Sequence, residues 1–273
     1  MTGSFDISAV VPTFNSSRTI EACLRSLALS EGVAVEVVVV DNHSTDDTAE
    51  IGRRLADRCI ICGPERSAQR NTGVRFASAE FVAVIDSDMV LEPRVLALAR
   101  KALLRDRTVE AVVLSERSFG AGFFARCRAL GKDISIGNPL VEGARVFRRS
   151  TFIDLGGYDE DLHAGEDWDF SDRVEAAGGH IARVDEAVVW HDEGRVSLPR
   201  TFQKKRHYGR SLLLYLGTPD RGESRRRLLQ ALSPAWMWRG LARPHLLAGL
   251  VLLRGFEVAG LATGVVEAWA KRR

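Results

Sequence analysis

Short apolar runs rich in β-branched residues alternate with segments of helical periodicity through the first 115 residues. Ile7 to Val11 and Val35 to Val40 are nearly continuous apolar runs, as expected for strands that are covered on both faces of a sheet. Between them, apolar residues recur at helical spacing, at Ile20, Cys23, Leu24 and Leu27. This order of strand, helix and strand predicts a βαβ unit with two parallel strands.

The alternation continues beyond this first unit. Further strands are predicted at 59–62, 81–85 and 111–114, and helices at 68–77 and from about 93 to 104. Asn15 to Ser17, and a capping box from Ser44 to Asp47, are candidates for helix starts. The predicted fold class is therefore α/β, with a Rossmann-like, mostly parallel central sheet flanked by helices.

The second half of the chain is less regular. We expect a polar, glycine-containing loop region at 117–139, a strand near 141–147 and a turn at Gly156-Gly157. A helix at 166–177 and a last pair of strands ending at Trp190-His191 complete this part.

Two carboxylates follow the apolar strand at 81–85, in the sequence Asp86-Ser87-Asp88. Alternate residues of an extended segment share a face, so both side chains can address one cation or one polar ligand. Hard oxygen ligands suit Mg²⁺ or Mn²⁺ that is shared with substrate phosphates. The alternative is a polar loop that caps the next helix. Because ligands bind beyond the carboxyl ends of strands in such sheets, the position favours a binding role.

Several motifs occur in a fixed order along the chain. They are Val10 to Asn15, Val39 to Asp46, Arg70-Asn71-Thr72-Gly73, Asp86-Ser87-Asp88, Gly156 to Glu160, Glu166-Asp167-Trp168 and His191. This series resembles the family 2 glycosyltransferases, which have the GT-A fold. The resemblance covers roughly residues 5–195. It implies a GT-A catalytic domain over 1–195, with a nucleotide-binding half at about 1–115 and an acceptor half at about 116–195.

The resemblance also implies roles for residues of the donor site. Contacts to the base and ribose of a nucleotide are expected at Pro12, Thr13, Asn15 and Asp41, with Arg70 near the same pocket. Asp86 resembles the first carboxylate of the family's DxD motif, near the ribose or the sugar. Two adjacent positions depart from the pattern. Asn42 stands where the family has a second acidic residue, and His43 stands in place of a frequent glycine. The first departure leaves the nucleobase open.

The remaining roles concern the metal and the acceptor. Asp88 and His191 match the family's ligands for a divalent cation, Mn²⁺ or Mg²⁺. Asp167 matches the catalytic base, and Glu166 and Trp168 are expected to position the sugar or the acceptor. Taken alone, the acidic residues could decorate a helix N-terminus, and His191 could be a satisfied histidine at a strand end.

The chemistry of sugar transfer is consistent with these assignments. A departing nucleoside diphosphate gains negative charge, which a divalent cation can neutralise. The attacking hydroxyl must lose its proton, and a general base is worth about 10² to 10⁴-fold in rate. One base with no evident protein nucleophile predicts inversion at the anomeric carbon. A nucleotidyltransferase, or a non-catalytic protein that binds nucleotide sugars, is the alternative class.

Charge is distributed unevenly along the chain. Residues 1–190 carry 22 Lys and Arg against 30 Asp and Glu, whereas residues 191–273 carry 16 against 6, a net charge of +10. Amphipathic helices are predicted over residues 196–273, which make up most of this basic part. Long apolar stretches interrupt its basic residues, which favours an anionic membrane surface over nucleic acid as partner. No spanning helix is predicted at 241–269, because charged residues interrupt it.

The N-terminal sequence and the number of cysteines predict where in the cell the protein acts. The N-terminus enters a strand pattern without a basic start and apolar region, and four cysteines are too few for a disulfide framework. We expect a cytoplasmic enzyme, peripheral on the inner face of a membrane, with a UDP-sugar as donor and a lipid-linked or cell-envelope glycan as acceptor.

Overall fold

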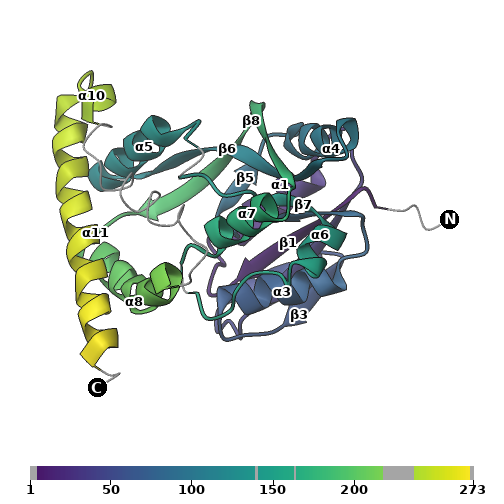
Figure 1. Ribbon diagram of the computed structural model, residues 1–273, viewed down its shortest axis with the longest axis horizontal. Coiled ribbons are helices and arrows are strands. Elements are labelled where there is room, and N and C mark those ends of the chain that lie inside the picture. Colours follow the sequence, from purple (N-terminus) through teal and green to yellow (C-terminus); the bar gives the residue numbers. More distant parts are fainter. Residues whose placement is uncertain (1–4, 139–140, 163, 218–236, 271–273) are drawn as a thin grey trace. The chain divides into compact units, whose positions relative to one another are not determined.

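A computed structural model describes residues 5–138, 141–162, 164–217 and 237–270 (Figure 1). The chain divides into two units. Unit 1 is formed by Met1–Glu116, Gly143–Glu160 and Phe170–His191, and unit 2 by Arg117–Glu142, Asp161–Asp169 and Asp192–Arg273. The division into a catalytic domain and a tail at residue 195 stays a prediction.

The first part of unit 1 is a parallel βα arrangement. Its strands are β1 (Ile7–Thr13), β2 (Val35–Asp41), β3 (Arg58–Ile61) and β4 (Phe81–Val84). β1 lies between β2 and β4, and all neighbours in this part are parallel. The connecting helices are α1 (Ile20–Ala28), α2 (Thr48–Leu55) and α3 (Arg66–Phe76). The predicted βαβ unit is confirmed.

The other strands of the sheet include antiparallel pairs. These strands are β5 (Met89–Leu91), β6 (Val109–Ala121), β7 (Val146–Arg148) and β8 (His180–Arg195), in the order β3-β2-β1-β4-β7-β6-β8-β5. β7 pairs antiparallel with both β4 and β6. The sheet is therefore mixed. α4 (Val95–Arg105), α6 (Arg149–Asp154) and α7 (Glu166–Ala176) complete the set of helices around it.

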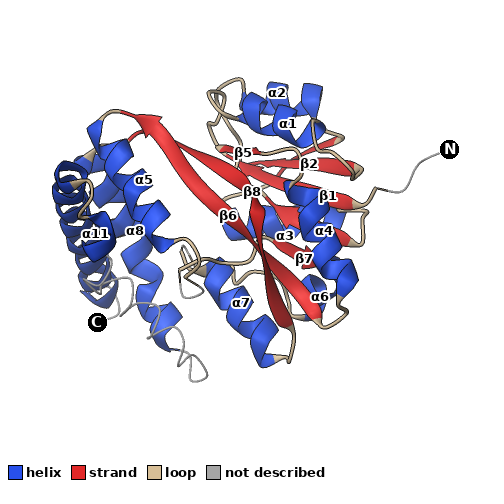
Figure 2. Cartoon of the chain, turned by 90° about the horizontal axis from the view of Figure 1, so that it is seen from above, coloured by secondary structure: helices blue, strands red, loops and turns tan. Residues whose placement is uncertain are grey.

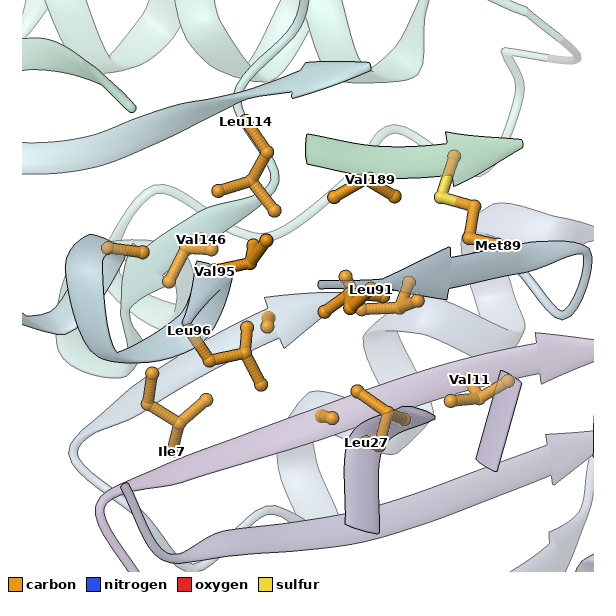
Figure 3. Packing of buried hydrophobic residues seen from close by; sticks show 14 of the residues in the cluster. Ile7, Val11, Leu27, Met89, Leu91, Val95, Leu96, Leu114, Val146 and Val189 are labelled. Atoms are coloured by element: carbon orange, nitrogen blue, oxygen red, sulfur yellow. The ribbon is translucent and has the colours of Figure 1, made fainter. Parts of the chain in front are cut away.

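Helices cover both faces of the sheet (Figure 2). One face packs against α1 and α4, and the other against α3, α6 and α7. Figure 3 shows the first of these clusters, where Leu27 of α1 and Leu96 of α4 meet Ile7 and Val11 of β1. Each such fully buried aliphatic side chain contributes roughly 1.5–3 kcal/mol to stability. This two-sided burial explains why the strands are continuous apolar runs.

Unit 2 is built around its last helix. It contains α5 (Phe123–Ser135), α8 (Leu198–Gly217), α10 (Met237–Gly240) and α11 (Pro244–Ala270). α11 packs along α8 and against α5 (Figures 1 and 2). Leu246 and Leu250 of α11 form a buried cluster with Cys127, Leu130 and Ile134 of α5.

Small residues let α11 approach α8 closely. A Cβ added at Gly264 would lie 2.1 Å from the backbone oxygen of Arg206, and one at Gly260 would lie 2.5 Å from that of Phe202. Glycine is needed at both positions because helix backbones come within contact distance there. By length and composition α11 is apolar enough to cross a membrane, and 39% of its most apolar stretch is buried within the structure. The sequence does not predict this continuous helix, because charged residues interrupt the apolar pattern.

Two expectations for the second half are wrong. The loop expected at 117–139 is instead the end of β6 followed by α5. Its polar and glycine residues suggested a loop, but Cys127, Leu130 and Ile134 recur at helical spacing and bury against α11. The last strands are one long strand, β8, which pairs antiparallel with β5.

The predicted helix caps are also wrong. α1 starts after Thr19, and Ser16 contributes its backbone carbonyl, which accepts hydrogen bonds from the N–H groups of Thr19 and Ile20. α2 starts after Asp47, which makes no side-chain cap bond. The hydroxyl of Ser44 donates to Asp41 and that of Ser16 to the carbonyl of Phe14, so neither caps a helix.

Candidate active site

The loops that follow β1, β2 and β4 are tied together by hydrogen bonds. The N–H of Asn15 donates to Ser44 Oγ at 2.8 Å, which joins the loops after β1 and β2. Ser87 Oγ donates to Ser16 Oγ at 2.9 Å, which joins the loops after β4 and β1. Because parallel strands end at the same edge, the three polar clusters found in the sequence form one continuous surface.

Asp41 and Asn15 hold the loop after β2 in place. Asp41 is 1% exposed, and its carboxylate accepts hydrogen bonds from the N–H of Ser44 at 2.9 Å and from its hydroxyl at 2.5 Å. Asn15 has φ +49°, a conformation that asparagine tolerates better than most residues, and its Oδ1 accepts from the N–H of Thr45 at 2.9 Å. His43, also left-handed at φ +52°, lies in the same loop.

Pro12 and Thr13 end β1, directly before this surface. Both residues are buried. Within the described part of the chain, Thr13 Oγ1 is buried without a hydrogen-bond partner. Gln69 of α3 donates to the carbonyls of Thr13 at 2.9 Å and of Val40 at 2.7 Å, so it clamps the ends of β1 and β2. The nucleotide contacts of Pro12, Thr13, Asn15 and Asp41 stay predictions.

Asp86, the first carboxylate after β4, is held between two arginines. Arg70 of α3 lies 2.6 Å from its Oδ1, and Arg145 lies 3.4 Å from its Oδ2. Burial alone raises the pKa of Asp86, but Arg70, Arg145 and Arg66 together hold that pKa well below its usual range. Arg70 is itself 2% exposed, with its guanidinium 5.4 Å from the ring centre of Tyr158. Asp86 is thus a neutralised anion with a fixed orientation.

Asp88, the second carboxylate, is paired with a histidine and is more open. His191 pairs with Met89 across the β5–β8 ladder, which places its ring beside the preceding residue. Its Nε2 lies 3.2 Å from Asp88 Oδ2, and its Nδ1 lies 3.9 Å from Glu116 Oε2 of β6. The side chain of Asp88 is 39% exposed, against 17% for Asp86. The two aspartates of the motif therefore differ in environment.

Asp88 and His191 fit a divalent cation that is shared with a substrate. Among the described residues, no group of three His, Cys, Asp or Glu side chains could hold a metal ion by itself. With Asp88 and His191 as ligands, a cation would take its other ligands from phosphate oxygens and water, as Mg²⁺ does beside carboxylates in phosphate-binding sites. Imidazole nitrogen also suits transition metals, which makes Mn²⁺ a compatible ion.

Glu166, Asp167 and Trp168 lie in unit 2, at the first turn of α7. Asp167 Oδ1 accepts a hydrogen bond from the N–H of Trp168 at 2.9 Å. The indole of Trp168 donates to the carbonyl of Val141 at 2.9 Å, and Glu166 is 2% exposed. The roles of these three residues stay predictions from the sequence.

Sequence reasoning missed two residues that complete the unit 1 site. Arg145 bonds to Glu116 through its Nε and also reaches Asp86. Glu116 in turn faces His191, so a chain of charged groups runs from Asp86 to Asp88. The position of Glu116 shortly after the predicted strand at 111–114 could have indicated a role at the edge of the sheet. For Arg145, the sequence offered only the presence of a charged residue in an apolar segment.

An open mixed sheet with helices on both faces, and a carboxylate pair after β4, define the GT-A class of fold. Residues 8–149 match the model of glycosyl transferase family 2, and the chain belongs to this family.

Relatives of known name support this placement. The pre-mycofactocin glycosyltransferase of Mycobacterium tuberculosis is 31% identical over 76% of this chain and 46% of its own length. The succinoglycan biosynthesis protein ExoO of Rhizobium meliloti is 31% identical over 70% of this chain and 62% of its own length. The chain thus spans between about half and two thirds of these relatives.

Solved structures share the fold. The mannosyltransferase PcManGT from Pyrobaculum calidifontis, in complex with GDP-Man and Mn²⁺, has a TM-score of 0.68 at 20% identity, covering 100% of this chain and 89% of its own. Glucosyl-3-phosphoglycerate synthase from Mycobacterium tuberculosis, with Mn²⁺ and UDP, has a TM-score of 0.53 at 23% identity, covering 80% of this chain and 82% of its own. At these identities the likeness concerns the fold alone.

Proposed function

We propose that the chain is an inverting glycosyltransferase that moves a sugar from a nucleoside diphosphate sugar, a UDP-sugar, to a hydroxyl acceptor. The observation that carries the proposal is the carboxylate pair after β4, with Asp86 fixed between two arginines and Asp88 open beside His191. The solved neighbours with GDP-Man or UDP, and with Mn²⁺, support a diphosphate donor.

Asp88 and His191 would hold a divalent cation together with the diphosphate. The cation, when bound, offsets the negative charge that develops on the departing nucleoside diphosphate. Arg70 and Arg145 keep Asp86 ionised and in one orientation, so that it can accept hydrogen bonds from a ribose or sugar hydroxyl. Positioning of this kind lowers the barrier because the donor is bound in one reactive geometry.

Asp167 would act as the general base. In a single displacement, the acceptor oxygen bonds to the anomeric carbon as the bond to the diphosphate oxygen breaks. The hydroxyl proton passes to the carboxylate of Asp167. The N–H of Trp168 fixes one oxygen of Asp167, which orients the carboxylate. Glu166 and Trp168 would position the sugar or the acceptor.

A lipid-linked or cell-envelope glycan is the proposed acceptor, used at the cytoplasmic face of a membrane. Two relatives support this choice by their names, the succinoglycan biosynthesis protein ExoO and the O-antigen chain rhamnosyltransferase WbaN of Salmonella anatum. The apolar helix α11 is consistent with work at a membrane.

Calorimetry with UDP, GDP and dTDP, with and without Mn²⁺, tests the donor site. We expect Mn²⁺-dependent binding of UDP by the wild type and a loss of about ten-fold or more in Asp88→Ala, since one metal ligand is removed. Asp185→Ala, which removes an exposed carboxylate elsewhere on β8, is the matched control. Binding of GDP instead of UDP would change the proposed nucleobase of the donor but would still support a glycosyltransferase. Absence of binding to all three nucleotides would refute the donor site.

The stereochemistry can be tested without knowing the acceptor. Water replaces the acceptor slowly in many transferases, so NMR of UDP-glucose hydrolysis shows which anomer of glucose is released first. Inversion predicts that β-glucose appears before mutarotation mixes the anomers. Release of α-glucose would contradict a single displacement.

A further inference from the structure

From residue 246 to its end, the exposed positions of α11 are apolar or small. All residues from 246 to 270 are described, and the exposed positions among them are Ala248, Val251, Leu252, Gly255, Val258, Ala259, Ala262, Val266, Trp269 and Ala270. None of these is charged. We call these ten residues the outer stripe. A helix on the surface of a water-soluble protein normally presents its polar residues outward, which is the opposite of what α11 does.

Two charged residues of α11, Glu257 and Glu267, instead face its neighbours in unit 2, while the Arg254 side chain, 41% exposed, pairs with Glu257. Glu267 accepts hydrogen bonds from Arg206 at 2.6 Å and from Arg210 at 3.2 Å, both on α8. Glu257 is 8% exposed and lies 3.6 Å from Arg128 of α5 and 2.8 Å from Arg254 of α11 itself. Since these pairs fix the rotation of the helix, the outer stripe cannot turn inward without breaking them.

We propose that the outer stripe is a lipid-binding surface, which lies in the plane of an anionic bilayer with its side chains among the headgroups and upper acyl chains. Residues 191–273 carry 16 Lys and Arg against 6 Asp and Glu. Arg200 and Lys204 of α8 and Arg243 before α11 are exposed and can reach anionic headgroups. An apolar stripe together with basic residues on neighbouring segments suits binding at the membrane interface.

Tryptophans mark the two ends of the apolar surface. Trp238 of α10 is 79% exposed and Trp269, near the end of α11, is 49% exposed. Indole rings favour the boundary between headgroups and acyl chains, because one edge is polar and the rest is apolar. The 27 residues of α11 extend about 40 Å, a length that suits a helix lying flat along the surface.

An in-plane position follows from the packing of α11 on α5 and α8. Leu246 and Leu250 are buried against α5, and Gly260 and Gly264 lie against the backbone of α8. A spanning orientation would expose this face, with Glu257 and Glu267, to lipid. A second copy of the chain is a poorer occupant, because pairing two outer stripes would bring together two segments that each carry a net charge of +10.

Vesicle flotation of the full chain tests the proposal. The vesicles contain phosphatidylcholine alone or phosphatidylcholine with phosphatidylglycerol. We expect binding to the mixed vesicles and weaker binding to phosphatidylcholine. Leu252→Glu on the outer stripe should weaken binding about ten-fold or more, because a buried leucine is exchanged for a charge. Leu104→Glu on α4 is the matched control, since Leu104 is 51% exposed and Leu252 is 48% exposed.

Val266→Glu, at a residue that is 63% exposed, is a second variant in case Leu252→Glu folds poorly. Circular dichroism and UDP binding should be unchanged in both variants, so loss of lipid binding is separable from failure of the donor site. Wild-type protein that stays off the mixed vesicles, or Glu variants that float like wild type, would overturn the proposal.

Two further outcomes would identify a different occupant. Light scattering that shows a dimer, which Leu252→Glu dissociates, would assign the outer stripe to a second copy. A Leu252→Cys variant should be labelled by a water-soluble maleimide in the absence of vesicles and protected in their presence, as read at peptide level by mass spectrometry. If the cysteine is already protected in water, the chain covers its own stripe and the lipid proposal fails.

Discussion

Unit 1 and the helix α11 of unit 2 place their charged residues in opposite ways. In unit 1 the core is apolar, and Asp86 and Asp88 emerge at the carboxyl edge of the sheet. In α11, Glu257 and Glu267 face inward to arginines of neighbouring helices, and the exposed positions are apolar. Charges at the carboxyl edge of the sheet are thus available to a ligand, whereas the inward charges of α11 fix the helix so that an apolar face is exposed.

The largest effect should come from Asp167, the proposed base. Asp167→Asn keeps the shape and the hydrogen bond to the Trp168 N–H but cannot take a proton, so kcat should fall by about 10² to 10⁴-fold. UDP binding should remain, because the donor site residues belong to unit 1. Steady-state kinetics and calorimetry on the same preparation measure both. A variant that keeps wild-type kcat would remove Asp167 from the mechanism.

The inward face of α11 can be compared with its outer stripe by two glycine substitutions in one helix. Gly264→Ala should destabilise unit 2 by about 1–3 kcal/mol, because its Cβ would overlap the backbone of α8. Gly255→Ala on the outer stripe meets nothing within 4 Å and should stabilise by up to about 1 kcal/mol, since alanine favours helix. Chemical denaturation measures both. Equal effects would contradict the assigned orientation of α11.

Substitutions of Arg145 test whether the charged groups that link Asp86 to Asp88 contribute to activity. Arg145→Met removes one of the cations beside Asp86 and the partner of Glu116, so we expect kcat/KM to fall about ten-fold with Asp88 and His191 intact. Arg145→Lys should recover part of the loss, since it restores charge without the planar fork. Mn²⁺ affinity, measured separately, should weaken in Arg145→Met. Unchanged affinity and rate would make Arg145 a purely structural residue.

Glu36 is a buried carboxylate in unit 1 and thus a counterpart to Glu257. Burial raises its pKa, but hydrogen bonds from Ser8 and Ser78 and the charge of Arg58 outweigh this, so the folded pKa is lower than the ordinary 4.5. Its contribution to stability is therefore present above pH 4.5 and is lost as pH falls through the lowered pKa.

The matching variant is Glu36→Gln. At pH 7 it should lower the free energy of unfolding by about 1 kcal/mol, because the hydrogen bonds from Ser8 and Ser78 are weakened, and the melting temperature should fall accordingly. In acid, the stability of the variant should decrease less steeply with falling pH than that of the wild type. Thermal melts between neutral and acidic pH compare the two proteins. A variant that loses stability in acid as steeply as wild type would show that other groups titrate there.

Sequence patterns predicted the parallel half of the sheet well, because each strand there is a continuous apolar run. The sequence also singled out Asp86, Asp88, Arg70 and His191, because all four belong to recognisable motifs, and their roles stay predictions. The structure brings these four together within unit 1.

The second half was harder because its patterns are set by tertiary contacts. β6 continues beyond residue 114 through polar residues, and α5 contains Gly131, whose neighbour across the packing interface is Leu250. Local sequence cannot reveal a partner more than one hundred residues away. Arg145 and Glu116 were missed for the same reason, because their meaning depends on two strands that lie side by side only in the folded sheet.

The interleaving of β4, β7, β6 and β8 also has a consequence for biosynthesis. β4 ends at Val84, yet the strand that carries His191 is made more than one hundred residues later. At ordinary rates of translation this is roughly 5–20 s, during which β5 has no β8 to pair with. The nascent chain therefore has an incomplete sheet edge during this time, and a ribosome stalled before residue 191 would hold a chain that lacks His191, the proposed metal ligand.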